Sequence, residues 1–250
     1  MADEAETVEE ARAFARRFVA AHYPAAVAAL LSGSRARGEA RPDSDYDLFL
    51  LFRHLPEGAF REKIRFEGRA FELFGHDPGT LSYFCRVVVA RSGVASVPEM
   101  VADGLILFGE REPALASTRA MAARTIAAGP PPLDHAMKRA RLSALAELRE
   151  TLATCPPGPA LTSVGAALYP LLADFALRSA GTWSASVKRM PAALAELDPA
   201  LGDRFAGAFT ALFGAGDPVP VLALADSLLA RHGVRPGDTF RIASPPNWRD

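Results

Sequence analysis

The residues best suited to chemistry lie in one stretch, residues 33–52, with the sequence GSRARGEARPDSDYDLFLLF. Asp45 and Asp47 stand two apart at the start of an apolar run that is typical of a buried strand. Residues two apart in a strand point to the same side, so the two carboxylates are held close together. The repulsion between the two negative charges costs free energy unless a cation neutralises it. Oxygen-only ligands favour a hard ion such as Mg²⁺. The pair therefore predicts a metal site.

The Gly33-Ser34 turn supplies the other half of the expected chemistry. It follows the apolar run of residues 25–31, which predicts a second buried strand. Glycine at such a turn lets backbone N–H groups and a hydroxyl come close to a phosphate. Arg35 and two further arginines add positive charge or lie on the solvated surface. A triphosphate would bridge turn and metal, and Ser34 lacks the Gly-x-Ser-x-Gly elbow expected of a nucleophile.

This arrangement resembles the signature of the polymerase-beta-like nucleotidyltransferase superfamily. Within that superfamily, the chain is similar to the bacterial group that includes aminoglycoside nucleotidyltransferases. The resemblance implies catalytic, metal-binding roles for Asp45 and Asp47 and nucleotide contacts for Gly33 and Ser34. Arg35 is included among the expected nucleotide-binding residues because of its charge and its place next to the turn. An isolated Asp-x-Asp is common by chance and also fits a strand-start turn, but its spacing from the Gly-Ser turn favours the catalytic interpretation.

The resemblance also implies a third carboxylate and a phosphate-binding lysine. Glu72 matches the third carboxylate by its place on a later strand, and a surface charge on a hairpin is the alternative. Lys188 matches a lysine that faces the nucleotide phosphates in the helical domains of relatives, although Val187 replaces the usual glycine. A solvated helix lysine is the alternative there.

Periodicity predicts a mixed first half and a helical second half. An apolar stripe in residues 7–22 predicts a helix that ends before Pro24. Two extended runs joined by Glu67-Gly68 predict a hairpin over residues 61–76, and Asp77 before Pro78 fits a helix start. Helices are expected at 78–91 and 97–103, followed by a strand at 105–108.

The segment Ala-Ala-Gly-Pro-Pro-Pro at residues 127–132 interrupts this pattern, because consecutive prolines sustain neither a helix nor an interior strand. We therefore predict a nucleotidyltransferase domain at 1–126, a linker at 127–132 and a helical bundle at 133–250. The fold class expected from the pattern and the resemblance is α+β, with a small mixed sheet followed by an α-helical bundle.

Composition narrows the classes of partner. Half of the 250 residues are hydrophobic, and the formal net charge of −1 disfavours a dedicated nucleic-acid coat. Only two cysteines occur, far apart, which fits a reducing cytoplasm and no zinc knuckle. The N-terminus lacks the pattern of a secretory signal, and no uninterrupted apolar stretch predicts a membrane span.

The expected activity is transfer of a nucleoside monophosphate, AMP from ATP or a related unit from another nucleoside triphosphate, to a hydroxyl of a small molecule. Two Mg²⁺ ions would be shared by Asp45, Asp47 and Glu72, and Glu72 would also serve as general base. An aminoglycoside is one candidate acceptor. The alternatives are an antitoxin-like enzyme that adenylylates a partner protein and a nonenzymatic nucleotide-binding module. The sequence leaves the nucleotide, the acceptor and the oligomeric state open.

Overall fold

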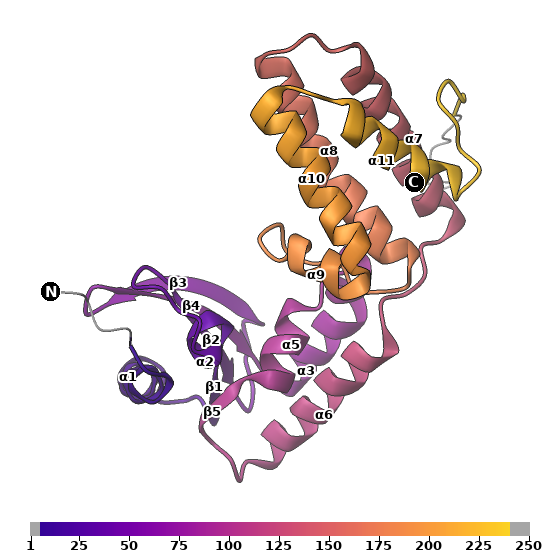
Figure 1. The fold of residues 1–250 in the computed structure, drawn as a ribbon. Coiled ribbons are helices and arrows are strands. Elements are labelled where there is room, and N and C mark those ends of the chain that lie inside the picture. Colours follow the sequence, from indigo (N-terminus) through magenta and orange to yellow (C-terminus); the bar gives the residue numbers. More distant parts are fainter. Residues whose placement is uncertain (1–5, 241–250) are drawn as a thin grey trace, which may run out of the picture. The chain divides into compact units, whose positions relative to one another are not determined.

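The computed structural model describes residues 6–240 of the chain (Figure 1). The chain divides into two compact units between Gly129 and Pro130. The first unit contains all the strands of the described chain, and the second is built from helices. The fold is therefore α+β, as predicted from the sequence.

A five-stranded mixed sheet forms the centre of the first unit, with the order β3-β4-β2-β1-β5. β2 is parallel to β4 and antiparallel to β1, so the sheet is mixed. The first strand begins later than expected because Pro24 and Ala25 form a turn. The strands are β1 (Ala28–Ser32), β2 (Tyr46–Leu51), β3 (Phe60–Phe66), β4 (Arg69–His76) and β5 (Leu105–Phe108).

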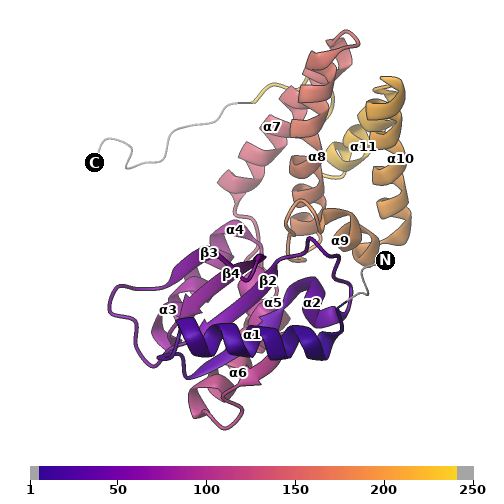
Figure 2. The same cartoon turned by 90° about the vertical axis from the view of Figure 1, so that its left-hand side faces the viewer.

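Helix α1 (Val8–His22) covers one face of the sheet (Figure 2). Its N-terminus is fixed by a capping box, in which Thr7 accepts from the Glu10 backbone N–H and the Glu10 side chain accepts from Thr7. The apolar stripe predicted from the sequence is buried here. Phe18, fully buried, stacks on Phe71 of β4 with ring centroids 3.9 Å apart. This aromatic contact contributes strongly to joining helix and sheet.

The opposite face is covered by the helices that follow β4. They pack against sheet residues such as Phe49 and Leu51 through Leu81, Cys85 and Val101. These helices are α3 (Pro78–Tyr83), the π-helical turn η1 (Phe84–Val89), α4 (Ala90–Ser92), α5 (Ser96–Asp103) and α6 (Pro113–Ala128). The single helix expected at 78–91 is thus three successive pieces.

The predicted hairpin is confirmed, with β3 and β4 antiparallel and Glu67 and Gly68 in the turn between them. Both turn residues have positive φ, 47° at Glu67 and 77° at Gly68. Such a two-residue turn suits the right-handed twist of the flanking strands. It also sets the register across the pair, in which Lys63 lies opposite Glu72.

The break between the two units begins later than the sequence predicted. We expected a linker from Ala127, but α6 continues through Ala127 and Ala128. Alanine is the best helix former, so the helix runs on until Gly129, whose φ of 70° ends it. The non-helical segment therefore covers residues 129–134, up to the N-cap Asp134 of the next helix.

The second unit consists of helices around one apolar core. Leu168, Leu172 and Phe175 lie at its centre with Phe205 and Leu228. Residues 155–158 separate the first two helices. The elements are α7 (His135–Thr154), α8 (Pro159–Ser179), α9 (Met190–Leu197), α10 (Pro199–Ala215) and α11 (Val219–Ala230).

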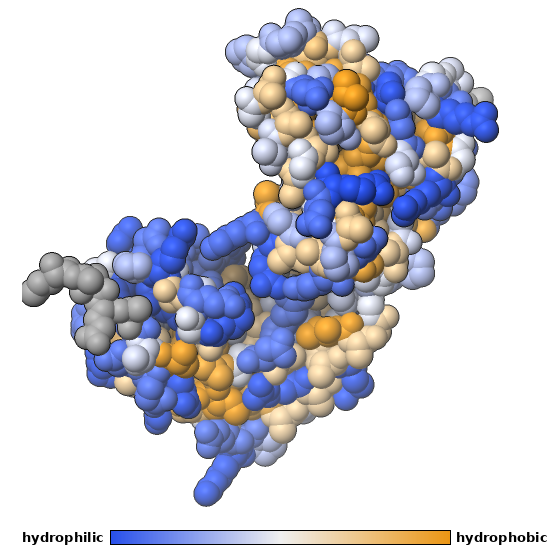
Figure 3. All heavy atoms as spheres, viewed as in Figure 1, coloured by the Kyte–Doolittle hydropathy of each residue, from blue (hydrophilic) through white to orange (hydrophobic). Residues whose placement is uncertain are grey.

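Within residues 6–240, α8 alone is long and apolar enough to cross a membrane by length and composition. Its most apolar window is 44% buried inside the protein, and Leu168 and Leu172 belong to the unit's core. Polar and apolar side chains are interspersed on the visible face of this unit (Figure 3). The composition of α8 is thus accounted for by its packing.

His76 predicts an acid-sensitive step in stability. Burial of its imidazole, whose ring lies against Phe49 and Phe84, lowers its pKa to about 4, below the ordinary histidine value of 6.5. The unfolded chain therefore binds this proton first. Stability from neutral His76 is fully present above pH 6.5 and is lost as pH falls toward 4. The expected loss between pH 7 and 4.5 is on the order of 2–3 kcal/mol.

Urea denaturation followed by circular dichroism at both pH values measures this loss. The control variant His76→Asn lacks the titrating group, so its stability should fall less between the two pH values than that of the wild type. Equal acid losses in the two proteins would contradict the assignment.

Candidate active site

The register of the sheet places Ser32, Asp47 and Glu72 side by side on three adjacent strands. Asp47 of β2 is paired with Ser32 of β1 on one side and with Glu72 of β4 on the other. Paired residues of neighbouring strands project from the same face of a sheet. Asp47 and Glu72 are both half-buried, whereas Phe71 and Leu73, which point the other way, are fully buried. The sheet thus presents two carboxylates next to the end of β1.

Gly33 comes directly against the Asp47 carboxylate. Its φ is 70°, a left-handed value that glycine adopts without strain. A Cβ at this position would lie 2.0 Å from Asp47 Oδ2 and 2.9 Å from Asp47 Cγ. Any side chain here would displace the carboxylate. The structure thus brings the turn and the Asp47 carboxylate together.

Asp45 and Ser34 are also half-buried, like Asp47 and Glu72. Asp45 immediately precedes the first residue of β2, and Ser34 is the second residue of the short helix α2 (Gly33–Arg37). Because β1 ends where β2 begins, both residues flank Asp47 at the same end of the strand pair. Four of the predicted residues are therefore contributed by one strand–turn–strand segment.

Glu72 is already engaged by cations from the neighbouring strand. Arg61 donates to Glu72 Oε1 through Nε at 2.5 Å, and Lys63 Nζ lies 3.7 Å from Oε2. Glu72 is 12% exposed, whereas Arg61 and Lys63 are 64% and 66% exposed. The carboxylate is therefore paired in this structure with two solvent-exposed cationic side chains.

The donor chemistry of this set fits a hard divalent ion, because Asp45, Asp47 and Glu72 offer only carboxylate oxygens. Within residues 6–240, however, no three Asp, Glu, His or Cys side chains are gathered closely enough to hold a metal ion. The predicted three-carboxylate site is thus not assembled here, and the pairing of Glu72 with Arg61 and Lys63 gives the physical reason. Asp47 lies in β2, whereas Asp45 immediately precedes the strand, and their joint binding of a metal ion stays a prediction from the sequence.

Arg35 is engaged by other residues of the first unit, and its contact with a nucleotide stays a prediction from the sequence. Its guanidinium is 4% exposed and stacks on the Tyr46 ring, with Cζ 4.1 Å from the centroid. Tyr46 points to the face opposite Asp47, because adjacent strand residues alternate. Arg35 also pairs with Glu6 and donates to the Ser44 carbonyl. This arginine balances a buried charge rather than facing the carboxylates.

A polar cluster fixes the start of β2 from that opposite face. The Tyr46 hydroxyl donates to Glu6, and Arg69 pairs with Glu6 and donates to Tyr46 at 2.5 Å. Burial, with the hydrogen bond to Glu6, raises the pKa of Tyr46 to about 12. Tyr46 therefore stays a hydrogen-bond donor throughout the physiological range, and it lies between Asp45 and Asp47 in sequence.

Lys188 belongs to the second unit, where it is exposed in the turn directly before α9. Its contact with nucleotide phosphates stays a prediction from the sequence.

Sequence reasoning missed Arg61 and Lys63, although a signal for them existed. A two-residue turn at Glu67-Gly68 sets the register of the hairpin, and that register places Lys63 opposite Glu72. Counting outward from the turn would have located these cations. Glu6 gave no comparable signal, because its partners are separated from it by 29 to 63 residues along the chain.

Comparison with known proteins agrees with this site. Residues 14–78 match the family model of the nucleotidyltransferase domain, a range that contains Gly33, Asp45, Asp47 and Glu72. The chain is also similar to a solved nucleotidyltransferase-like protein from Exiguobacterium sibiricum, at 14% identity over 90% of this chain and 74% of that chain, with a TM-score of 0.42. No curated protein matches the chain. The domain match supports nucleotidyl transfer and implies a nucleotide substrate.

Gly33→Ala should sharply reduce nucleotide-dependent activity, because the added Cβ would displace the Asp47 carboxylate. Gly38→Ala is a matched control, since its φ is 71° but the nearest atom to an added Cβ is Val8 Cγ2 at 3.5 Å. Both variants should lose about 1–2 kcal/mol of stability from the left-handed backbone. Only Gly33→Ala should also lose nucleotide-dependent pyrophosphate release, by at least about 100-fold. Similar activity in the two variants would contradict the role of this contact.

Proposed function

We propose that the chain transfers AMP from ATP to a hydroxyl group of a small molecule. The observation that carries the proposal is the row formed by the Gly33 turn, Asp47 and Glu72 on adjacent strands. A turn whose backbone is open to phosphate, placed against paired aspartates, suits a nucleoside triphosphate better than a neutral ligand. The nucleotidyltransferase domain match at residues 14–78 supports the same class of reaction.

In this reaction the acceptor oxygen attacks the α-phosphorus, the bond from that phosphorus to the β-bridging oxygen breaks, and pyrophosphate leaves. Asp45 and Asp47 would hold Mg²⁺, which neutralises the triphosphate and lowers the pKa of the attacking hydroxyl. Gly33 and Ser34 would bind the terminal phosphates. Their neighbouring position on one strand–turn–strand segment keeps these groups at a fixed separation.

Glu72 would accept the proton of the acceptor hydroxyl and share a second ion with the aspartates. To do so, its carboxylate must first exchange the contacts with Arg61 and Lys63. Both cations are largely solvent-exposed, so the exchange requires side-chain rotation and no backbone movement. Once released, they would stand beside the triphosphate and offset part of its charge.

The choice of acceptor depends on which acidic side chains are available to bind it. An aminoglycoside is polycationic and would call for uncommitted acidic side chains. Several acidic residues of the second unit are engaged structurally: Asp174 with Arg141, Asp198 as the N-cap of α10, and Glu150 with the Gly237 backbone N–H. We therefore propose that the acceptor is a hydroxylated small molecule and that the protein acts in the cytoplasm. Aminoglycosides are the first class of acceptor to test.

Asp45→Asn and Asp47→Asn should each lower kcat/KM for ATP-dependent transfer by at least about 100-fold, because an amide cannot replace a charged ligand to Mg²⁺. The assay uses radiolabelled ATP, Mg²⁺ and an acceptor panel that includes aminoglycosides, and follows labelled product and pyrophosphate. Asp43→Asn is the matched control, since Asp43 is an exposed residue of the same loop paired with Arg41 at 3.5 Å. Activity that survives in both site variants would refute the metal site.

Arg61→Gln should lower the Mg²⁺ concentration needed for half-maximal activity by about fivefold, because it removes the cation that competes for Glu72. Arg65→Gln is the control, since Arg65 is an exposed residue of the same strand whose register partner is Ala70. The control should show a smaller change. An unchanged or increased Mg²⁺ requirement in Arg61→Gln would show that Arg61 does not compete with the ion.

A further inference from the structure

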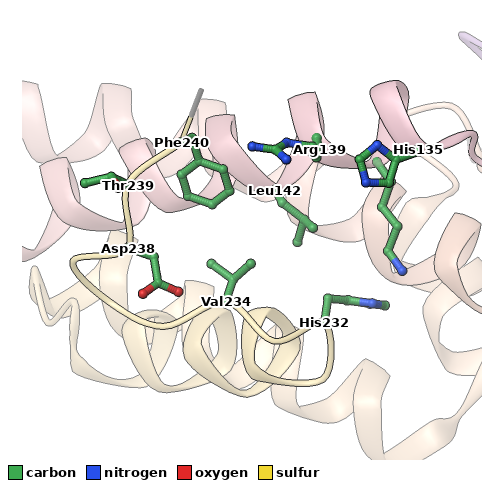
Figure 4. Close-up of a pocket in the computed structure, with 9 residues that line it drawn as sticks. His135, Arg139, Leu142, His232, Val234, Asp238, Thr239 and Phe240 are labelled. Atoms are coloured by element: carbon green, nitrogen blue, oxygen red, sulfur yellow. The ribbon is translucent and has the colours of Figure 1, made fainter. Parts of the chain in front are cut away.

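The second unit contains a pocket of about 500 Å³ to which the proposed reaction assigns no role. It lies between the first turns of α7 and the segment that follows α11 (Figure 4). The volume is within the range of sites that hold small organic molecules. The lining residues are His135, Lys138, Arg139, Leu142, His232, Val234, Asp238, Thr239 and Phe240.

Basic side chains gather in this pocket from two elements. Lys138 and Arg139 come from α7, together with the imidazole of His135, and His232 comes from the turn after α11. The acidic residue of the lining, Asp238, already accepts a hydrogen bond from the Arg235 backbone N–H at 2.7 Å. Because Lys138 and Arg139 outnumber Asp238, the charged side chains of the lining carry a net positive charge.

The remaining wall is apolar. Leu142 and Val234 face each other across the pocket, and the Phe240 ring lies on the same side as Arg139 (Figure 4). Val234 is 8% exposed and Leu142 is 6% exposed, so both are anchored in the core of the unit. A ligand that fills this space would contact both hydrocarbon surface and cationic groups.

Hydrogen bonds hold the segment that closes the pocket. The Val234 backbone N–H donates to the Leu229 carbonyl at 3.1 Å, and the Gly237 N–H donates to Glu150 of α7 at 3.0 Å. The His232 ring meets Phe175 edge-on, with centroids 4.9 Å apart. The pocket is thus formed before any ligand arrives, which reduces the entropic cost of binding.

The electrostatic environment of His232 agrees with this charge balance. Burial lowers the pKa of His232, and the positive charges of Lys138 and Arg231 lower it further. The two cations therefore create a positive potential within the pocket, which a bound anion would offset.

We propose that this pocket binds a small organic anion that combines an apolar ring with a phosphate, sulfonate or carboxylate head. Lys138 and Arg139 would contact the head group, and Leu142, Val234 and Phe240 would contact the ring. The site is built from residues of the second unit alone, so the proposal does not depend on nucleotidyl transfer.

Two dyes with the same ring system test the proposal on the full chain. 1-Anilinonaphthalene-8-sulfonate carries the anionic head, and N-phenyl-1-naphthylamine lacks it. The sulfonate should bind at one site per chain at least about tenfold more tightly than the neutral dye, as followed by fluorescence. Phenyl phosphate or benzoate should displace it, and the stronger competitor identifies the preferred head.

Substitutions locate the binding site. Lys138→Gln and Arg139→Gln should each weaken binding of the sulfonate by at least about fivefold. Lys138→Arg should retain binding, and so should Arg204→Gln, which removes an exposed charge on α10. Equal affinity for the two dyes, unchanged binding in both Gln variants, or displacement by neither competitor would overturn the proposal. The dye comparison on the wild type decides the matter even where a variant fails to fold.

Discussion

The close approach of the Gly33 backbone to the Asp47 carboxylate is the constraint on which the candidate site depends. A Cβ at residue 33 would stand 2.0 Å from Asp47 Oδ2, so the turn and the strand meet only because this residue is glycine. The contact requires β1 and β2 to be antiparallel and Ser32 to pair with Asp47. The sheet topology, the turn geometry and the position of the Asp47 carboxylate thus depend on one another.

The side chains of β2 alternate between the two faces of the sheet. Tyr46 and Leu48 point into the core beneath α1, whereas Asp47 points to the opposite face. The contacts of Tyr46 with Glu6 and Arg35 hold the strand on the face that α1 covers. The Asp47 carboxylate is therefore positioned by interactions on the face of the sheet opposite to its own.

The first half of the fold was predictable because its signals are local. The Thr7 cap, the Glu67-Gly68 turn and the alternation around Asp47 each fix a structure within a few residues. The linker was placed too early because helix propensity carries α6 through Ala128 before Gly129 ends it. Boundaries of this kind depend on small differences between neighbouring residues.

The remaining features of the site depend on contacts between distant segments. Arg35 was expected to face phosphate, but Glu6 and Tyr46 bind it on the other side of the sheet. The engagement of Glu72 by Arg61 follows from hairpin register, and the pocket at Lys138 joins segments as distant in sequence as His135 and Phe240. Sequence patterns identify which residues can do chemistry, whereas tertiary packing decides which of them are free to do it.

A crystal structure of the protein with Mn²⁺ and α,β-methylene ATP, which cannot release pyrophosphate, tests the central claim most directly. We expect anomalous scattering from Mn²⁺ at roughly 2.2 Å from carboxylate oxygens of Asp45 and Asp47, with the triphosphate against the Gly33 turn and Glu72 separated from Arg61. A nucleotide bound with its metal remote from both aspartates would contradict the account.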